Sequence, residues 1–393
     1  AEKNPHSLIG PYLSGKESLK VRTRATEENM FENGSVKIKT KPFYTVKALD
    51  VSIPKGRMIA VTGVSGSGKT SLVIECLVPA LQAVIQGTKL PEHVDSIEAK
   101  GIQSVKVIDS KPIGANVRST VATYDGVFDD LRKLFARTAD AKAKGLTAGD
   151  FSYNTGKLRC PVCDGTGIIT MDVQFLPDVD TICPSCGGSR YGKDAYDILW
   201  KSKEKDSVSV SLPGLLKLTV EEAAGILHEE TKIAKQLKIL QDLGVCYLTL
   251  GEATPALSGG EAQRLKLAYE METPQQGSVF VFDEPTIGLH PQDVKKLVLI
   301  FDHLIQLGAT VIVIEHDLEL VTNCDYIIDM GPWGGTEGGR VVVEGTPEAV
   351  AATSESITGR YLKQELAEDK KCSGKFRKKS FAVKHIFRKY QKI

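Results

Sequence analysis

The segment Gly63–Thr70 constrains the fold of this chain more than any other. It reads GVSGSGKT and fits the pattern G-x-x-x-x-G-K-[ST]. An apolar run over 57–62 predicts a buried strand before it, and the residues over 69–86 predict a helix after it. Glycines let backbone N–H groups curl around phosphate oxygens, and the start of a helix adds its positive dipole end. A Gly-rich turn with a chance lysine is the alternative, and the strand–loop–helix context disfavours it.

This loop predicts a binding site for ATP with Mg²⁺. Lys69 is expected on the β- and γ-phosphates, and Thr70 is expected on the magnesium ion. The residues expected to contact the nucleotide are Gly63, Ser65, Gly66, Ser67, Gly68, Lys69, Thr70 and Ser71.

A second acidic element follows a hydrophobic strand predicted over 278–282. Asp283 and Glu284 stand where that strand ends, which is where α/β sheets bind ligands. Asp283 is placed to bind Mg²⁺, and Glu284 is placed to orient and deprotonate the attacking water. Alone, such a pair is more often a solvated strand end, but the phosphate loop favours the functional interpretation.

The order of elements predicts an α/β fold with a largely parallel sheet. Further strands are expected over 46–53, 105–109, 310–314, 326–330 and 340–343, with helices over 220–243, after 258 and from about 292. Strands that alternate with helices are typical of such sheets.

Composition excludes two broad classes. The chain has 393 residues, of which 41% are hydrophobic, so there is enough apolar matter for a core and the chain is not disordered as a whole. The apolar runs are of strand length, too short for a membrane helix.

The segment 370–393 carries ten Lys or Arg and no acid, which leaves 40 basic against 49 acidic residues elsewhere. Phe376, Phe381, Phe387 and Tyr390 are interleaved with these charges, a mixture that suits nucleic acid or a disordered solubilising tail.

Four of the eight cysteines predict a structural zinc site. Cys160 and Cys163 form one C-x-x-C pair, and Cys183 and Cys186 form another. Two such pairs separated by a loop of this length suit tetrahedral Zn²⁺. A redox pair or an iron–sulfur cluster is the alternative.

A third motif lies at Leu257–Glu261, with the sequence LSGGE. Ser258 can cap a helix, and Gly259 and Gly260 expose the first amides of that helix. The residues alone do not say what those amides bind, and a plain loop with a helix cap is the alternative.

The pentapeptide resembles the signature of ATP-binding-cassette (ABC) ATPases. In that family a strand-end Asp-Glu and then a strand followed by His come after the signature, and this chain has Asp283-Glu284 and His316 in that order. The resemblance implies that His316 contacts the γ-phosphate. It also implies that Ser258, Gly259 and Gly260 face ATP held by the phosphate loop of another cassette. A second ABC cassette is therefore an expected partner, either in a homodimer or from a separate N-terminal-half chain.

The whole chain resembles the C-terminal half of the UvrA family, the damage-sensing subunits of bacterial nucleotide excision repair. The resemblance covers about residues 5–365. It rests on the amino-acid sequences of the phosphate loop, the cysteine region and the segments over 112–114, 122–124, 188–191, 255–264 and 283–290. It implies an ATPase that binds double-stranded DNA in the cytoplasm, without a membrane partner. Lys157, Arg159 and Arg190 flank the cysteines and are candidates for phosphate contacts; solvated surface charge is the alternative.

Two departures from the family pattern stand out. The family has Asp-Gln-Ser before Pro-Ile-Gly, whereas this chain has Asp109-Ser110-Lys111, so hydrolysis or its coupling is expected to differ. The first cassette, with the region that docks the B subunit, is absent from this sequence. Partnership with UvrB is therefore not expected unless another chain supplies that half.

The sequence predicts five segments. They are a linker or N-terminal arm over 1–42, an ATPase core over 43–110 and 250–365, an inserted helical region over 111–249, a zinc module within it over 157–192, and a basic tail over 366–393. Two other functions remain open: a UvrA-like protein of drug resistance or the ribosome, and, with less support, the ATPase subunit of a transporter.

Overall fold

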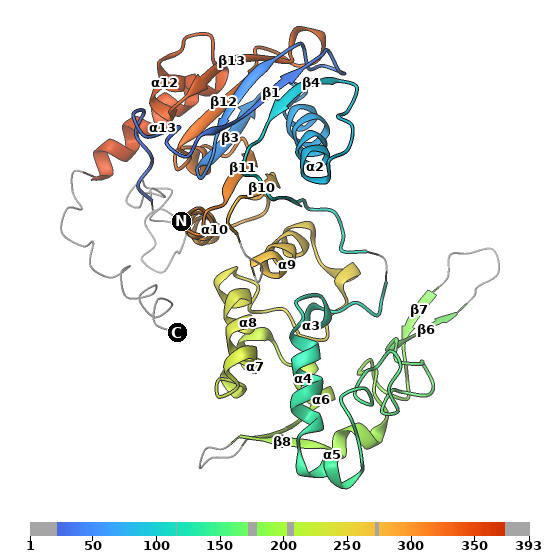
Figure 1. The fold of residues 1–393 in the computed structure, drawn as a ribbon. Helices are drawn as coiled ribbons and strands as arrows, with labels where there is room; N and C mark the ends of the chain where they lie inside the picture. Colours follow the sequence, from blue (N-terminus) through green and yellow to red (C-terminus); the bar gives the residue numbers. More distant parts are fainter. Residues whose placement is uncertain (1–21, 115, 172–178, 203–207, 272–274, 374–393) are drawn as a thin grey trace. The chain divides into compact units, whose positions relative to one another are not determined.

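The computed structural model describes residues 22–114, 116–171, 179–202, 208–271 and 275–373. The chain divides into two compact units (Figure 1). The "sheet unit" comprises Ala1–Ile108 and Gln275–Ile393, and the "inserted unit" comprises Asp109–Pro274.

A six-stranded sheet forms the centre of the sheet unit. Its order is β13-β12-β3-β11-β10-β5, and β13 alone runs antiparallel to its neighbour. Strands β3, β10 and β11 are buried almost throughout, as expected for parallel strands covered on both faces. The bounds are β3 Met58–Gly63, β5 Ser104–Ile108, β10 Ser278–Asp283, β11 Thr310–Ile314, β12 Tyr326–Gly331 and β13 Arg340–Gly345.

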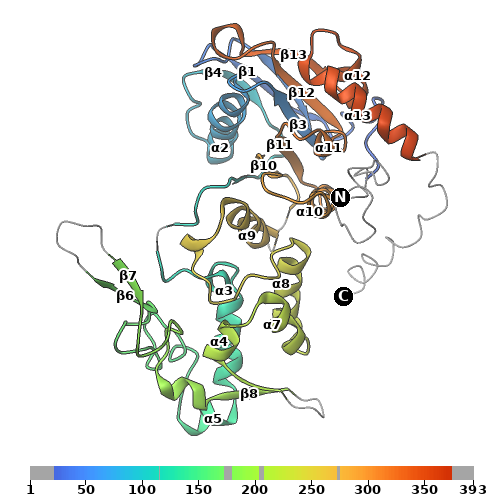
Figure 2. The ribbon, with the colours of Figure 1, turned by 180° about the vertical axis from the view of Figure 1, so that it is seen from behind.

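Both helices that the sequence predicted for this unit, over 69–86 and from about 292, are present (Figure 2). The helix expected over 69–86 begins as a π-helical segment, η1, and continues as α2, which ends at Gly87 in the left-handed conformation that favours glycine. The bounds are η1 Ser71–Leu77, α2 Val78–Gln86, α10 Pro291–Gln306, α11 Leu318–Val321, η4 Gly335–Glu337, α12 Pro347–Ala352 and α13 Ile357–Ser373.

A second, antiparallel sheet corrects the prediction of an arm over 1–42. Strand β1 (Ser35–Thr40) pairs with β2 (Asp50–Pro54) on one side and with β4 (Val94–Glu98) on the other. Alternate residues of β1, such as Val36 and Ile38, are buried. The polar residues between them made this segment read as a linker, although a half-buried strand alternates in the same way. The strand expected over 46–53 begins only at Asp50.

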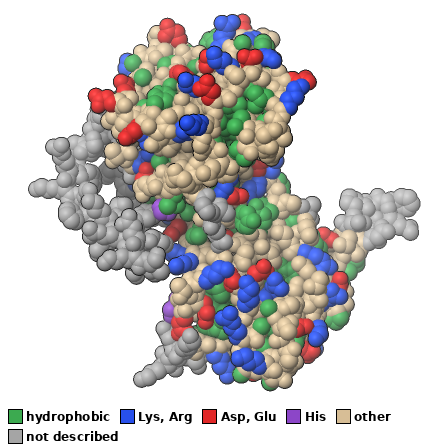
Figure 3. Space-filling model, in the orientation of Figure 1, with side chains coloured by type: hydrophobic (Ala, Val, Ile, Leu, Met, Phe, Trp, Pro, Cys, Tyr) green, Lys and Arg blue, Asp and Glu red, His purple; other side chains and the backbone are tan. Residues whose placement is uncertain are grey.

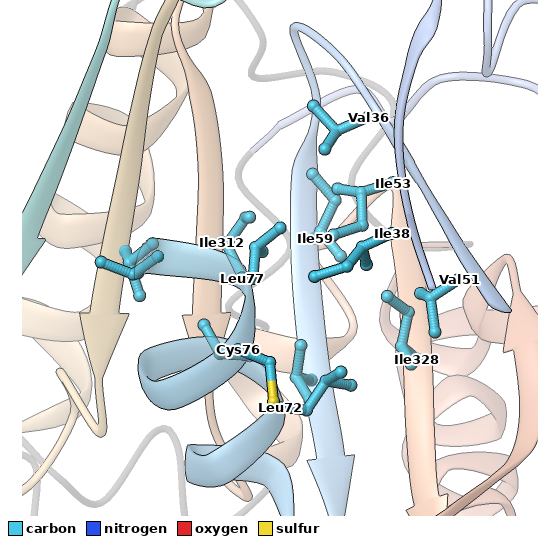
Figure 4. Close-up of a cluster of buried hydrophobic side chains, with 14 of the residues drawn as sticks. Val36, Ile38, Val51, Ile53, Ile59, Leu72, Cys76, Leu77, Ile312 and Ile328 are labelled. Carbon is cyan, nitrogen blue, oxygen red and sulfur yellow. The ribbon is translucent and has the colours of Figure 1, made fainter. Parts of the chain in front are cut away.

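The two sheets share one hydrophobic core. Figure 4 shows Ile38 of β1 and Ile53 of β2 beside Ile59 of β3, with Leu72 and Leu77 of η1 close by. This packing holds η1, and with it the loop before η1, firmly against the end of β3.

In the described residues of the inserted unit, helices make up most of the regular structure, beside two small hairpins. Its helices are α3 Val121–Tyr124, α4 Val127–Ala136, α5 Ala139–Ala143, η2 Lys193–Asp197, α6 Leu212–Leu216, α7 Val220–Ile226, α8 Thr231–Asp242, η3 Thr254–Ala256 and α9 Gly259–Met271. Strands β6 (Ile168–Met171) and β7 (Val179–Ile182) form one hairpin, and β8 (Leu199–Lys201) and β9 (Ser209–Ser211) form the other.

The boundary between the units differs from the expected one. Residues 250–271, assigned by sequence to the ATPase core, lie in the inserted unit. The hydroxyl of Thr254 donates to the carbonyl of Ile113, and the ring of Tyr269 packs on that of Tyr124. The first contact holds the turn before α9, and the second holds α9 against α3, both within the inserted unit.

The C-terminal end of the described chain bears on the predicted basic tail. Helix α13 continues to Ser373, so the first residues of the expected tail are helical. The rest of the tail lies outside the described residues.

Among the helices that the structure describes, none combines the length and the apolar character needed to cross a membrane.

Candidate functional site

The phosphate loop connects β3 to η1 at the carboxyl end of the parallel strands. A side chain on Gly63 would lie 2.0 Å from the carbonyl oxygen of Met330 in the neighbouring strand, and Gly63 has φ +130°. Only glycine fits this close approach. Gly66 and Gly68 also have positive φ, so the loop has the backbone that its sequence predicted.

The side chain of Lys69 folds back over this loop. Its Nζ donates to the carbonyl oxygens of Gly63 and Val64, at 2.9 Å each. Burial lowers the pKa of Lys69, opposed by the carboxylates of Glu284, Asp329 and Asp283. The carboxylates around the amine favour its charged form and partly offset the larger effect of burial.

Ser67 offers a test of whether a phosphate fits. Its side chain is fully buried, and its Oγ has no hydrogen-bond partner in the described part of the chain. A buried hydroxyl without a partner is costly, and a phosphate oxygen would satisfy it. The loop is also held by backbone bonds from Gly335 to Gly66 and from Gly339 to Ser67. Thr70 and Ser71 follow at the start of η1, where Thr70 is exposed.

The strand-end residues come together because β10 and β11 are parallel neighbours. Asp283 is paired with Ile314 in the register of the sheet, so Glu284 and His316 follow these strands at one edge. The Nδ1 atom of His316 lies 3.7 Å from Oε1 of Glu284. Both side chains are open to solvent, at 41% for Glu284 and 66% for His316, so both can reach a bound molecule.

Glu284 has a strained backbone. Its φ is +47°, and a left-handed non-glycine residue costs about 1–3 kcal/mol. Its N–H donates to the carbonyl of Ile314 at 3.0 Å. The surroundings thus hold this carboxylate in one orientation at the strand end.

Glu315 is a buried residue at the site to which the sequence analysis gave no role. Its side chain is fully buried, and its carboxylate accepts hydrogen bonds from Thr286, His316 and Asp317. The available signal was a carboxylate placed between a buried strand and the histidine. An acidic residue is rarely buried there unless it is fully paired.

The signature segment forms a reciprocal helix cap in the inserted unit. The N–H of Ser258 donates to Oε2 of Glu261 at 2.7 Å, and the N–H of Glu261 donates to Oγ of Ser258 at 3.4 Å. This capping box leaves Gly259 and Gly260 in the first turn of α9. A side chain on Gly259 would lie 3.0 Å from the carbonyl oxygen of Ser110, so the signature packs directly on the segment where the expected glutamine is missing.

The four predicted cysteines form one cluster. Their Sγ atoms all lie within 4.8 Å of one another. Cys160 and Cys183 are 4.0 Å apart, and Cys163 and Cys186 are 3.7 Å apart. Sulfur atoms about 2.3 Å from a tetrahedral zinc ion are separated by about 3.8 Å, so the cluster has the size of a zinc site.

The acid–base properties of the thiols also fit a cation. Burial acts to raise the pKa of Cys160, but hydrogen bonds from the backbone of Cys163 and Val162 outweigh it and lower that pKa to about 7. Burial, with the neighbouring Cys163 and Cys183 thiols, raises the pKa of Cys186 to about 12. Four thiolates this close would repel one another, and a divalent cation removes that repulsion.

The three candidate DNA residues have different surroundings. Lys157 is exposed and lies 3.5 Å from Asp150, and Arg159 pairs with Asp164 at 3.0 Å. Arg190 is only 6% exposed; its Nη1 donates to the carbonyl of Val117, and its guanidinium lies over the ring of Tyr153. We therefore correct the prediction for Arg190, which braces the cysteine module from inside. Figure 3 shows Lys and Arg side chains on the visible face of the inserted unit.

Comparison with known proteins gives close relatives. The chain is 42% identical over 374 residues to UvrABC system protein A of Staphylococcus aureus (strain COL), a match that covers 94% of this chain and 38% of the relative. It is 41% identical over 371 residues to UvrABC system protein A of Bacillus subtilis (strain 168), with the same two coverages. The chain thus spans less than two-fifths of the length of these relatives. No protein-family model matches the chain.

The fold of this chain is also similar to that of a solved UvrA structure. The crystal structure of UvrA2 from Deinococcus radiodurans matches with a TM-score of 0.83 and 38% identity, covering 93% of this chain and 43% of that one. The predicted α/β fold with a largely parallel sheet and an inserted four-cysteine module that could hold a metal is confirmed. The chain is a homologue of UvrABC system protein A, as the motifs of its sequence indicated.

Proposed function

We propose that this chain binds and hydrolyses ATP and binds double-stranded DNA as a UvrA-like protein of nucleotide excision repair, acting in damage recognition. The observation that carries the proposal is the meeting of Lys69, Glu284 and His316 at one edge of the parallel sheet, in a homologue of UvrABC system protein A. Phosphate binding alone would not need a carboxylate held at this strand end by a strained backbone, as that of Glu284 is.

Each group has a role in the proposed hydrolysis. The amides of the phosphate loop and the Nζ of Lys69 bind the phosphates, and the hydroxyl of Ser67 gains a partner there. Glu284 accepts a proton from the attacking water. His316 contacts the γ-phosphate from the next strand end. Thr70 and Asp283 would hold Mg²⁺, which neutralises the phosphate charge when it is bound.

The signature residues Ser258, Gly259 and Gly260 are proposed to bind ATP held by a second cassette. That cassette comes from another copy of this chain or from a separate chain with the N-terminal half. The reciprocal cap between Ser258 and Glu261 supports this role, because it keeps the first turn of α9 ordered. Phosphate oxygens bind well at such helix ends.

We propose that Cys160, Cys163, Cys183 and Cys186 hold a structural Zn²⁺ ion. The distances between the sulfur atoms support this proposal. Zinc with four thiolates has no open position for catalysis. It would fix a module that carries Lys157 and Arg159 on its surface, two side chains that can contact DNA phosphates. The expected setting for this work is the cytoplasm.

Equilibrium binding to a short duplex tests the DNA proposal. The full chain is titrated with ATP at fixed salt, using one duplex with a single bulky lesion and one without it. Tighter binding to the lesion supports damage recognition, and equal binding supports a DNA-binding ATPase that does not itself discriminate. Absence of binding to both contradicts the proposal, and co-sedimentation with ribosomes would then favour the ribosomal alternative.

A further inference from the structure

We propose that Glu315 is a positioning residue that holds Glu284 and His316 in their working arrangement. The proposal rests on the ATPase function proposed above and adds a residue to its machinery. Glu315 touches neither substrate nor reacting atoms in this account. It acts through the two loops that follow β10 and β11.

The carboxylate of Glu315 joins these two loops directly. Its Oε1 accepts from the N–H of Thr286 at 2.9 Å and from the hydroxyl of Thr286 at 2.5 Å. Its Oε2 accepts from the N–H groups of His316 at 2.9 Å and Asp317 at 3.1 Å. One oxygen thus serves the loop of Glu284, and the other serves the loop of His316.

The loop of Glu284 needs such a support. Glu284 has φ +47°, and a backbone of this kind persists only where its neighbours hold it. The N–H of Glu284 is bonded to Ile314 on one side of the turn, and Thr286, on the other side, is bonded to Glu315. The turn that aims Glu284 is therefore fixed at both ends by consecutive residues of the β11 strand end.

Burial makes this link rigid. The side chain of Glu315 is fully buried, and a buried carboxylate is stable only when its oxygens are hydrogen-bonded. A movement of either loop would leave that carboxylate without partners. The two loops therefore move together, which keeps Nδ1 of His316 close to Oε1 of Glu284, 3.7 Å away in this structure.

A carboxylate is needed here, because all four bonds arrive from donors. Glutamine has the same shape, but its NH₂ group donates and cannot accept. In Glu315→Gln, either the N–H of Thr286 or the N–H groups of His316 and Asp317 would face that NH₂ group. One of the two loops must then move, whichever way the amide turns.

The proposal predicts a change in turnover rather than in ATP binding. The hydrogen bonds that Nζ of Lys69 donates go to the carbonyl oxygens of Gly63 and Val64. Neither of them involves Glu315. We expect Glu315→Gln to lower kcat about 10- to 100-fold, by analogy with the range found when hydrogen-bond partners that orient metal ligands are lost. The KM for ATP should change by less than about threefold, because uniform binding is retained.

Steady-state phosphate release by the full chain tests this expectation. The variants are Glu315→Gln, the milder Thr286→Val, and Glu98→Gln as a control on a glutamate whose side chain is 77% exposed. Backbone hydrogen exchange over 284–288, 315–317 and 63–70 is measured in parallel. Glu315→Gln should speed exchange in the first two segments and leave the third unchanged, and Thr286→Val should give a smaller fall in kcat.

The outcomes separate the two proposals. An unchanged kcat in Glu315→Gln, or a rise in KM as large as the fall in kcat, overturns the positioning role. If Glu315→Gln does not fold, the same criterion applies to Thr286→Val, which removes one hydroxyl only. If the wild-type chain releases no phosphate, the ATPase proposal fails, and the exchange rates still decide whether Glu315 holds both loops.

Discussion

The amine of Lys266 donates to the carboxylate of Asp109 at 2.5 Å, and this pair ties the signature helix to the segment that follows β5. The same amine also donates to the carbonyl oxygens of Asp109 and Lys111, at 3.0 and 2.8 Å. These carbonyls stand on either side of Ser110, where the family has glutamine. The segment is thus anchored by its backbone, whatever side chain stands at Ser110.

Lys266→Met should therefore destabilise the inserted unit. The change leaves the carboxylate of Asp109 without its partly buried cation, and hydrogen bonds to charged groups are worth about 1.5–3 kcal/mol. Urea unfolding should show a lower midpoint, with Lys235→Met, an exposed lysine of α8, as the control. Equal urea midpoints for the two variants would mean that the ion pair between Lys266 and Asp109 does not stabilise the inserted unit.

Lys69→Ala should abolish tight ATP binding. The loop keeps its glycines, but it loses the cation that faces the phosphates, and hydrogen bonds between charged groups are the strong ones. We expect the Kd for ATP to rise at least about tenfold, the equivalent of about 1.4 kcal/mol. Titration with a fluorescent ATP analogue measures this, and Lys89→Ala, an exposed lysine after α2, should bind normally. Unchanged affinity in Lys69→Ala would count against the phosphate site.

Replacement of both Cys160 and Cys183 by serine should remove the metal. The purified wild type should carry about one zinc per chain, and the variant close to none, because two hydroxyls are poor ligands for this ion. Elemental analysis gives the zinc content directly. Loss of zinc should also weaken duplex binding, whereas the Kd for ATP, which depends on the other unit, should stay the same. Full zinc content in the variant would refute the four-cysteine site.

Lys157→Glu with Arg159→Glu should weaken duplex binding through charge alone. Both side chains lie outside the buried core. Each cation that no longer binds a DNA phosphate should reduce the slope of log K against log salt by about one, so this double variant should lose about two. Binding isotherms at several salt concentrations measure this slope. A slope equal to that of the wild type would place the DNA elsewhere on the molecule.

The sequence predicted the parts of this molecule that depend on local patterns. The phosphate loop, the strand Thr310–Ile314 and the four-cysteine cluster all have strong short-range signals, and the structure contains each of them. Strand β1 was missed because its polar residues, such as Lys37 and Lys39, face solvent and resemble a linker.

Long-range contacts explain the other differences. Arg190 has the charge of a surface residue, and its burial follows from Val117 and Tyr153, residues distant in sequence. Glu315 is unremarkable beside His316 in the sequence, and only the parallel register of β10 and β11 brings Thr286 to its carboxylate. The position of Arg190 or of Glu315 in the sequence does not show which distant residues its side chain contacts.

Phosphate release by the wild type and by Glu284→Gln, with and without duplex DNA, tests the central claim most directly. Glutamine keeps the shape of the side chain but removes the base. The account predicts steady release by the wild type and none above background by the variant, although both bind ATP equally. Equal release by the two proteins, or none by the wild type with a second cassette supplied, would contradict it.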